Sequence, residues 1–174
     1  RPLIENLPAE WTIVFYSNVE CPDPWTDFFR GCCETWVDIT TMDDDAVAAR
    51  IGSDEIDVLL DLNGHTLGGR PGVFARKPAP VQLTWLDYVN TTGLTSFDAI
   101  VVDAGHVPHS EQPRYAEPIV HVADDLYRYA PPWNAPPVTD LPLARNGFVT
   151  FGCFNAAYKL SSRTLSLWSE VLHA

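Results

Sequence analysis

Residues 56–93 read IDVLLDLNGHTLGGRPGVFARKPAPVQLTWLDYVNTTG, and this stretch decides the fold. Two apolar runs within it, Ile56–Leu62 and Val81–Leu86, have the length and the bounding turns of buried strands. Such runs suit a parallel sheet that is covered on both faces. Each run is followed by a polar loop that contains glycine, residues 63–70 and 87–93. Because ligands of open α/β sheets bind beyond the carboxyl ends of the strands, we expect the functional site in these two loops.

Strand-like and helix-like segments alternate on both sides of this stretch. Further strands are expected at Trp11–Tyr16, Trp36–Ile39, Phe97–Asp103 and Ile119–Ala123, and helices at Pro22–Cys33, from Asp43–Asp45 to about Ile51, and at Arg70–Lys77 with Val73 and Phe74 facing inward. This rhythm is typical of βαβ units. The sequence therefore predicts an α/β fold with a Rossmann-like parallel sheet.

Prolines are dense between Tyr129 and Pro137, which predicts a stiff, irregular connector and a domain boundary. Beyond it we expect a strand at Phe148–Phe154 and a helix from about Ser162, with Ser161 as its N-cap. The predicted organisation is one unit over residues 1–128, a linker over 129–146 and the start of a second unit over 147–174. The absence of Met at residue 1 and the helical pattern at the other end favour a segment of a longer polypeptide.

The composition narrows the classes of function. The net charge of −12 disfavours nucleic acid or an anionic membrane as the main partner, since both need a basic surface. No apolar run approaches the roughly 20 residues that a bilayer span requires. The four cysteines show no spacing that suggests a zinc site, and we interpret them as reduced, buried thiols of a cytoplasmic protein.

The first polar loop contains candidate catalytic residues. Gly64 and its neighbours allow a ligand to approach the backbone, with Thr66 as a polar group of the cleft. His65 is a candidate general base or hydrogen-bond partner of the substrate, and the alternative is a loop histidine that ties down the backbone. Arg70 is a candidate partner of an anionic ligand, and the alternative is an arginine that bonds Asp61 or a carbonyl.

The second polar loop contains candidate cleft residues. We expect Tyr88, Thr91, Thr92 and Gly93 to line a cleft together with Gln82, which stands at the start of the preceding strand. The alternative for Gln82 is that it satisfies buried backbone groups.

The segment between the last expected strand and helix contains Asn155 and Lys159. A lysine before a helix N-terminus is well placed to hold a phosphate, because the free N–H groups and the helix dipole add to its charge. The alternative is a solvated lysine.

These motifs together resemble the catalytic region of the O-linked N-acetylglucosamine transferases, the family in which that region follows tetratricopeptide repeats. The matching residues are Asp61–Thr66, Arg70, Phe74–Gln82, Trp85–Leu86, Tyr88, Thr91–Gly93, Phe97–Asp98, Asp103, Tyr115–Glu117, Phe151–Asn155, Tyr158–Lys159 and Trp168. The resemblance runs from about Trp11 to the C-terminus. It departs from the family's usual Trp-Leu-Gly-Tyr-Pro-Gly, which reads Trp-Leu-Asp-Tyr-Val-Asn at residues 85–90, and from its second Asn after Phe-Asn, where Ala156 stands.

The resemblance implies a GT-B architecture and a metal-free, cofactor-free inverting transfer of N-acetylglucosamine, or another hexose, from a UDP-sugar to Ser or Thr hydroxyls of proteins. Lys159 matches the family lysine that contacts the donor diphosphate, and Asn155 would lie beside it. His65, Arg70 and the Thr91–Gly93 turn would line the first-domain side of the cleft. Implied partners are protein acceptors, and tetratricopeptide repeats and the rest of the catalytic region in the same full-length chain.

Two other functions remain open at this point. One is a catalytically impaired relative that serves as a protein-binding module, for which the altered segment Asp87–Asn90 would be the signature. The other is a nucleotide-sugar epimerase of GT-B shape.

Overall fold

The structure is a computed structural model that describes residues 1–173 apart from residues 124 and 128, and it divides into two compact units, Arg1–Ala130 and Pro131–Ala174. The elements of the first unit are α1 (Pro2–Glu5), β1 (Val14–Ser17), α2 (Pro24–Arg30), β2 (Thr35–Asp38), α3 (Asp44–Ser53), β3 (Val58–Asp61), α4 (Pro71–Ala75), β4 (Val81–Trp85), β5 (Ala99–Val102), the 3-10 helix η1 (His109–Arg114) and β6 (Ile119–His121). Those of the second are α5 (Pro142–Asn146), the 3-10 helix η2 (Ala157–Lys159) and α6 (Ser162–His173).

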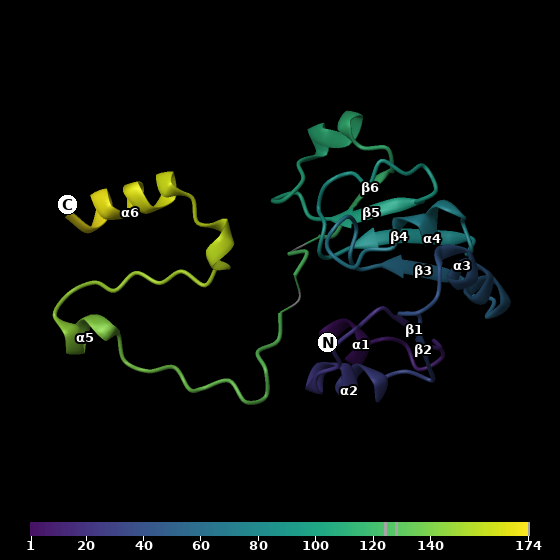
Figure 1. Cartoon of the computed structure of the whole chain (residues 1–174), viewed down its shortest axis with the longest axis horizontal. Helices are drawn as coiled ribbons and strands as arrows, with labels where there is room; N and C mark the ends of the chain where they lie inside the picture. Colours follow the sequence, from purple (N-terminus) through teal and green to yellow (C-terminus); the bar gives the residue numbers. More distant parts are fainter. Residues whose placement is uncertain (124, 128, 174) are drawn as a thin grey trace. The chain divides into compact units, whose positions relative to one another are not determined.

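The strands of the first unit form two parallel sheets. β1 pairs with β2, and β3, β4, β5 and β6 form a four-stranded sheet in that order, seen side by side in Figure 1. The predicted parallel α/β sheet is confirmed. Because neighbouring strands run in the same direction, the loops that follow β3 and β4 leave the same edge of the sheet.

The main core lies where α3 and α4 pack near β3. Val47 and Ile51 of α3 and Val73 of α4 are each at most 2% exposed, and Phe74 stacks on Phe97 with ring centroids 4.9 Å apart. Each such side chain stabilises the fold by about 1.5–3 kcal/mol relative to an exposed one. The predicted inward orientation of Val73 and Phe74 is confirmed.

The start of α3 is fixed by its own sequence. Asp43 is the N-cap, and its carboxylate accepts a hydrogen bond from Ala46 N at 2.8 Å. Asp44 and Asp45 follow in the first turn, where negative charge interacts favourably with the helix dipole. The acidic run thus begins a helix, as predicted. Its last two members, Asp44 and Asp45, also form ion pairs with Arg70 and Arg76, the N-cap and C-cap of α4.

The opposite side of the sheet is lined by large apolar side chains. Leu60 of β3, Trp85 of β4 and Val101 of β5 border an open, mostly apolar cavity of about 490 Å³, together with residues of α1 and Leu126. This cavity lacks the polar groups of the two candidate loops, so its size alone does not make it the site of chemistry.

The second unit corrects one prediction. The strand expected at Phe148–Phe154 is wrong: within the described residues of this unit the elements are all helical, and Phe151 and Phe154 are 67% and 105% exposed. A β-prone segment becomes a strand only when another strand supplies hydrogen-bond partners. The helix prediction is confirmed, since Ser161 Oγ accepts a hydrogen bond from Thr164 N at 3.1 Å at the start of α6.

Two further properties concern the surface. The prediction of buried thiols is wrong, because Cys21 and Cys153 are exposed and Cys32 and Cys33 are half-buried. The cysteines are free thiols. None of the helices in the described part of the chain combines the length and the apolarity that a membrane span needs.

Candidate functional site

The first loop is shaped by Asp61, the last residue of β3. Its two carboxylate oxygens accept hydrogen bonds from Asn63 N and Gly64 N, both at 3.0 Å, and Thr84 Oγ1 of β4 donates to it at 3.3 Å. Asp61 is only 7% exposed. A buried carboxylate with three donors is well satisfied, so Asp61 turns the chain at the strand end and is not itself presented to a ligand.

The two predicted loops contact each other, as expected. The ring of His65 stands edge-on to Tyr88 with centroids 5.4 Å apart, and His65 Nε2 lies 2.7 Å from Thr92 O. Thr66 Oγ1 donates to Asp87 Oδ2 at 2.8 Å. The structure thus brings together predicted residues from positions more than 20 apart in the sequence.

Gly64 is required for this contact. Its φ of +54° lies in the left-handed region, and a Cβ there would overlap the Cβ of Tyr88. Leu86, just after β4, has a φ of +88°, which is costly for a residue with a side chain. The loop that presents Tyr88 is therefore held in a strained backbone conformation by its surroundings.

The hydrogen bond of His65 determines where its ring proton lies. Because a carbonyl oxygen can only accept, Nε2 must carry the proton that it shares with Thr92 O. In the neutral ring Nδ1 then has a free lone pair, and among the described residues it has no hydrogen-bond partner. The residue is exposed, so Nδ1 is able to accept a proton or a hydrogen bond from a ligand.

The second loop is held from behind by residues 115–117. Tyr115 Oη donates to Val89 O at 2.7 Å, and Glu117 accepts from Thr91 Oγ1 at 2.8 Å and from Thr92 N at 2.7 Å. Burial raises the pKa of the Tyr115 hydroxyl above its ordinary value, which keeps it a donor. These contacts give the Thr91–Gly93 turn a fixed backbone rather than a set of free ligand-binding hydroxyls.

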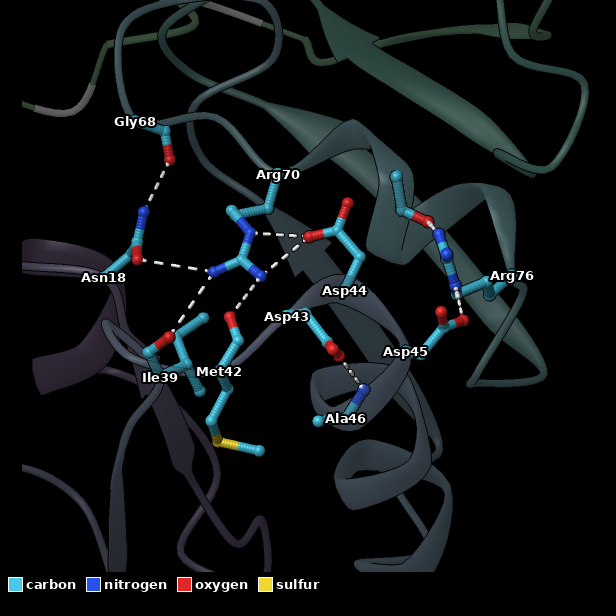
Figure 2. A network of polar contacts seen from close by, with 11 residues as sticks. Asn18, Ile39, Met42, Asp43, Asp44, Asp45, Ala46, Gly68, Arg70 and Arg76 are labelled. Atoms are coloured by element: carbon cyan, nitrogen blue, oxygen red, sulfur yellow. Dashed lines mark hydrogen bonds and ion pairs between the residues drawn. The ribbon is translucent and has the colours of Figure 1, made fainter.

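Arg70 is placed differently from the prediction (Figure 2). Its guanidinium points toward the start of α3 and donates to Asp44 Oδ1 at 2.7 Å and to Met42 O, just before that helix, at 2.9 Å. Two longer contacts reach Ile39 O at 3.4 Å and Asn18 Oδ1 at 3.5 Å. Asn18 Nδ2 in turn donates to Gly68 O at 3.1 Å. The side chain is 20% exposed. Its contacts match the structural alternative, bonding to carbonyls, with Asp44 rather than Asp61 as the carboxylate.

Gln82 also departs from the predicted cleft position. It is fully buried, and its Nε2 donates to Phe74 O at 2.9 Å and to Ser96 O at 3.0 Å. It stands near the amino end of β4, whereas the candidate loops follow the carboxyl ends. The alternative, that Gln82 satisfies buried backbone groups, is the one that its contacts match.

Asn155 and Lys159 lie in the second unit and are both exposed. Lys159 ends η2 and stands two residues before Ser161, the residue whose hydroxyl caps α6. The local geometry is therefore that of a cation next to a helix N-terminus. The assignment of both residues to a donor site stays a prediction.

A second acidic group lies at the same edge of the sheet, after β5. Asp103 accepts hydrogen bonds at 2.8 Å from Gly105 N, His106 N, Leu126 N and His106 Nδ1. The backbone donors lower the pKa of the Asp103 carboxyl from 3.8 to about 2. Within the described residues no group of three or more His, Cys, Asp or Glu side chains is arranged to hold a metal ion.

Sequence reasoning missed the contribution of Glu117. The residue belongs to the Tyr-Ala-Glu motif at residues 115–117, but nothing in that spacing indicates that its carboxylate reaches a turn 25 residues earlier. The only signal is an acidic residue two positions before a short apolar strand.

The comparison with known protein families decides the identity. The model of glycosyl transferase family 41 matches residues 10–128. The chain belongs to glycosyl transferase family 41. The predicted resemblance to the O-linked N-acetylglucosamine transferases is confirmed.

Individual relatives of this family 41 chain agree. It is 37% identical over 177 residues to the probable UDP-N-acetylglucosamine–peptide N-acetylglucosaminyltransferase SPINDLY of Petunia hybrida. The aligned region covers 99% of this chain and 19% of the petunia protein. It is 31% identical over 157 residues to the protein SEC of Arabidopsis thaliana, whose name gives the same probable activity, covering 85% and 16%. The chain thus spans about a fifth of the length of the curated relatives that it matches.

A solved structure supports the fold. A mutant O-GlcNAc transferase of Thermobaculum terrenum matches 99% of this family 41 chain and 32% of its own, with a TM-score of 0.88 and 33% identity. The GT-B type of α/β fold is confirmed. Neither the impaired binding module nor the epimerase is favoured by these matches.

Proposed function

We propose that the full-length protein transfers N-acetylglucosamine from UDP-N-acetylglucosamine to Ser or Thr hydroxyls of proteins, and that this chain is part of its catalytic region. The observation that carries the proposal is the match of 99% of the chain to a relative named as a probable enzyme of this activity. The contact of the two loops at the carboxyl edge of β3 and β4 supports it, because this edge is where α/β sheets bind ligands.

The proposed reaction is a single displacement with inversion. The hydroxyl oxygen of the acceptor attacks the anomeric carbon of the sugar, the bond from that carbon to the diphosphate breaks, and UDP leaves. The hydroxyl proton passes to a base. His65 suits this role because its Nε2 is fixed by Thr92 O and its Nδ1 lone pair is exposed.

On the donor side we propose that Lys159 and Asn155 bind the diphosphate. A cation next to the N-terminus of α6 offsets the charge that grows on the leaving UDP, an effect worth about 2–4 kcal/mol in comparable sites. We expect no metal or cofactor in this scheme. Arg70 has no chemical role in it, because its guanidinium already donates to Asp44 and to backbone carbonyls.

The proposal extends to the rest of the protein. The petunia relative is about five times as long as the matched region, which leaves room for tetratricopeptide repeats and for the remainder of the donor-binding half. A cytoplasmic location is also proposed, supported by the four free thiols.

The test uses the full-length protein with radiolabelled UDP-N-acetylglucosamine and a mixture of Ser- and Thr-containing peptides. We expect alkali-labile label on peptide and one UDP released for each sugar transferred, with the same rate in the presence of EDTA. Release of a free sugar or an epimer, or peptide binding without any transfer from UDP-sugars, contradicts the proposal.

A further inference from the structure

We propose that Glu117 is a positioning residue that fixes the orientation of His65 through Thr92. The proposal rests on the proposed function, since it assigns His65 its use in that reaction. Glu117 is 1% exposed. Such burial is rare for an acidic side chain unless it has strong partners. In the described part of the chain these partners are groups of the second loop rather than a cation.

Both oxygens of Glu117 are engaged with the turn. Oε1 accepts from Thr92 N at 2.7 Å and Oε2 accepts from Thr91 Oγ1 at 2.8 Å. The donor in the second contact is settled by counting. Thr91 Oγ1 already accepts from Gly93 N and from Ala116 N, each at 3.1 Å, so both of its lone pairs are used and its hydrogen must point to Glu117.

Thr92 connects this buried carboxylate to His65. Its N–H donates to Glu117, and its carbonyl oxygen, 2.7 Å from His65 Nε2, accepts from the ring. Thr92 is itself only 7% exposed. The backbone of Thr92 is therefore held by the buried carboxylate of Glu117, and the carbonyl of the same residue orients the exposed imidazole of His65. A carboxylate at residue 117 thus determines which ring nitrogen of His65 carries the proton and which faces a ligand.

The need for two acceptors distinguishes this role from simple packing. Glutamine has nearly the same shape as glutamate but offers only one acceptor oxygen. If that oxygen stays with Thr92 N, the amide NH₂ meets the hydroxyl hydrogen of Thr91, and two donors face each other. If it turns to Thr91, Thr92 N loses its partner. The Glu117→Gln substitution therefore loosens the turn without changing its volume.

The first test measures His65 directly in the full-length protein. Diethyl pyrocarbonate modifies unprotonated imidazole nitrogens, and mass spectrometry of the peptide that contains His65 gives the rate. In Glu117→Gln we expect this rate to rise about 2- to 10-fold, the range that follows from losing one hydrogen bond. Once Thr92 O no longer holds the proton on Nε2, the other tautomer, with an unprotonated Nε2, becomes populated and adds to the reaction at Nδ1. Glu111→Gln is the matched control, since Glu111 pairs with Arg114 on the surface of η1, and its rate should equal that of the wild type.

The second test measures transfer. Glu117→Gln should lower kcat about 10-fold, as expected when a reacting group loses its orientation, and leave the KM for the UDP-sugar unchanged. In a His65→Ala background the same substitution should have no further effect. An equal loss in both backgrounds, or an unchanged modification rate, overturns the proposal.

Two safeguards keep the result decisive. Glu117→Asp keeps the charge but is one methylene too short to reach both donors, so it should change the His65 rate in the same direction. If one variant fails to melt cooperatively, the other decides. If the wild type shows no transfer, the proposed function fails, and the modification rate alone decides whether Glu117 positions His65.

Discussion

A substitution of Arg70 tests whether this residue takes part in catalysis, as the sequence predicts, or only stabilises the fold, as its contacts in the structure indicate. The perturbation is Arg70→Gln in the full-length protein. It removes two short hydrogen bonds, to Asp44 at 2.7 Å and to Met42 O at 2.9 Å, and two long ones. The guanidinium thus joins the N-cap of α4 to Asp44 in the first turn of α3 and to the segments before that helix (Figure 2).

The magnitude follows from these contacts. Hydrogen bonds to charged groups contribute about 1.5–3 kcal/mol each, but the side chain is one-fifth exposed and solvent weakens the ion pair. We expect a local loss of about 2–3 kcal/mol. This corresponds to amide exchange about 30- to 150-fold faster in α3 and its N-terminal segment.

The assay is hydrogen exchange of the full-length protein read by mass spectrometry. Arg76→Gln is the matched control, because Arg76 pairs with the neighbouring Asp45 but both side chains are more exposed, 39% and 81%. Such surface pairs contribute about 0–1 kcal/mol. If Arg70→Gln exchanges no faster than Arg76→Gln and yet abolishes transfer, Arg70 contacts a ligand and the structural interpretation is wrong.

Three other predictions concern single residues. Lys159→Ala in the full-length enzyme should weaken UDP binding and lower kcat/KM about 30- to 1,000-fold, which corresponds to the ~2–4 kcal/mol assigned to its charge. Arg163→Ala is the control and should change neither quantity. If the two substitutions have equal effects, Lys159 does not belong to the donor site. The pKa of the Asp103 carboxyl is about 2 in the folded protein against an ordinary 3.8, so its contribution to the free energy of unfolding is present above pH 3.8 and is lost as the pH falls toward 2. Unfolding followed by tryptophan fluorescence should therefore show that Asp103→Asn loses less stability than the wild type between pH 3.8 and 2. Gly64→Ala should lower the melting temperature more than Gly93→Ala, because both have positive φ but only Gly64 has no space for a Cβ; similar shifts contradict the close packing of the loops.

The sequence predicted those features that depend on local pattern. Apolar runs located β3 and β4, and Asp43 to Asp45 located the start of α3. The contact between the two loops also followed from the sequence, because parallel neighbouring strands bring their carboxyl ends together. The sequence therefore predicts that His65 and Thr92 lie in one region, and their hydrogen bond agrees with it.

Features that depend on long-range partners were not predicted. The charge of Arg70 suggests an anionic ligand, but the guanidinium is already paired with the carboxylate of Asp44, 26 residues earlier in the sequence. Gln82 was assigned to the cleft although its side chain serves the carbonyls of Phe74 and Ser96. The strand expected at Phe148–Phe154 needs a neighbouring strand that no sequence pattern within the segment supplies.

The central claim is that the contact between the loops after β3 and β4 forms the acceptor side of the catalytic site. The most direct measurement is a structure of the full-length protein with a UDP-sugar analogue and an acceptor peptide. We predict that the acceptor hydroxyl lies within about 2.6–3.2 Å of His65 Nδ1, or is joined to it by one water, with His65 Nε2 still on Thr92 O. A peptide hydroxyl bound away from these loops, with His65 Nδ1 facing solvent, would contradict the account.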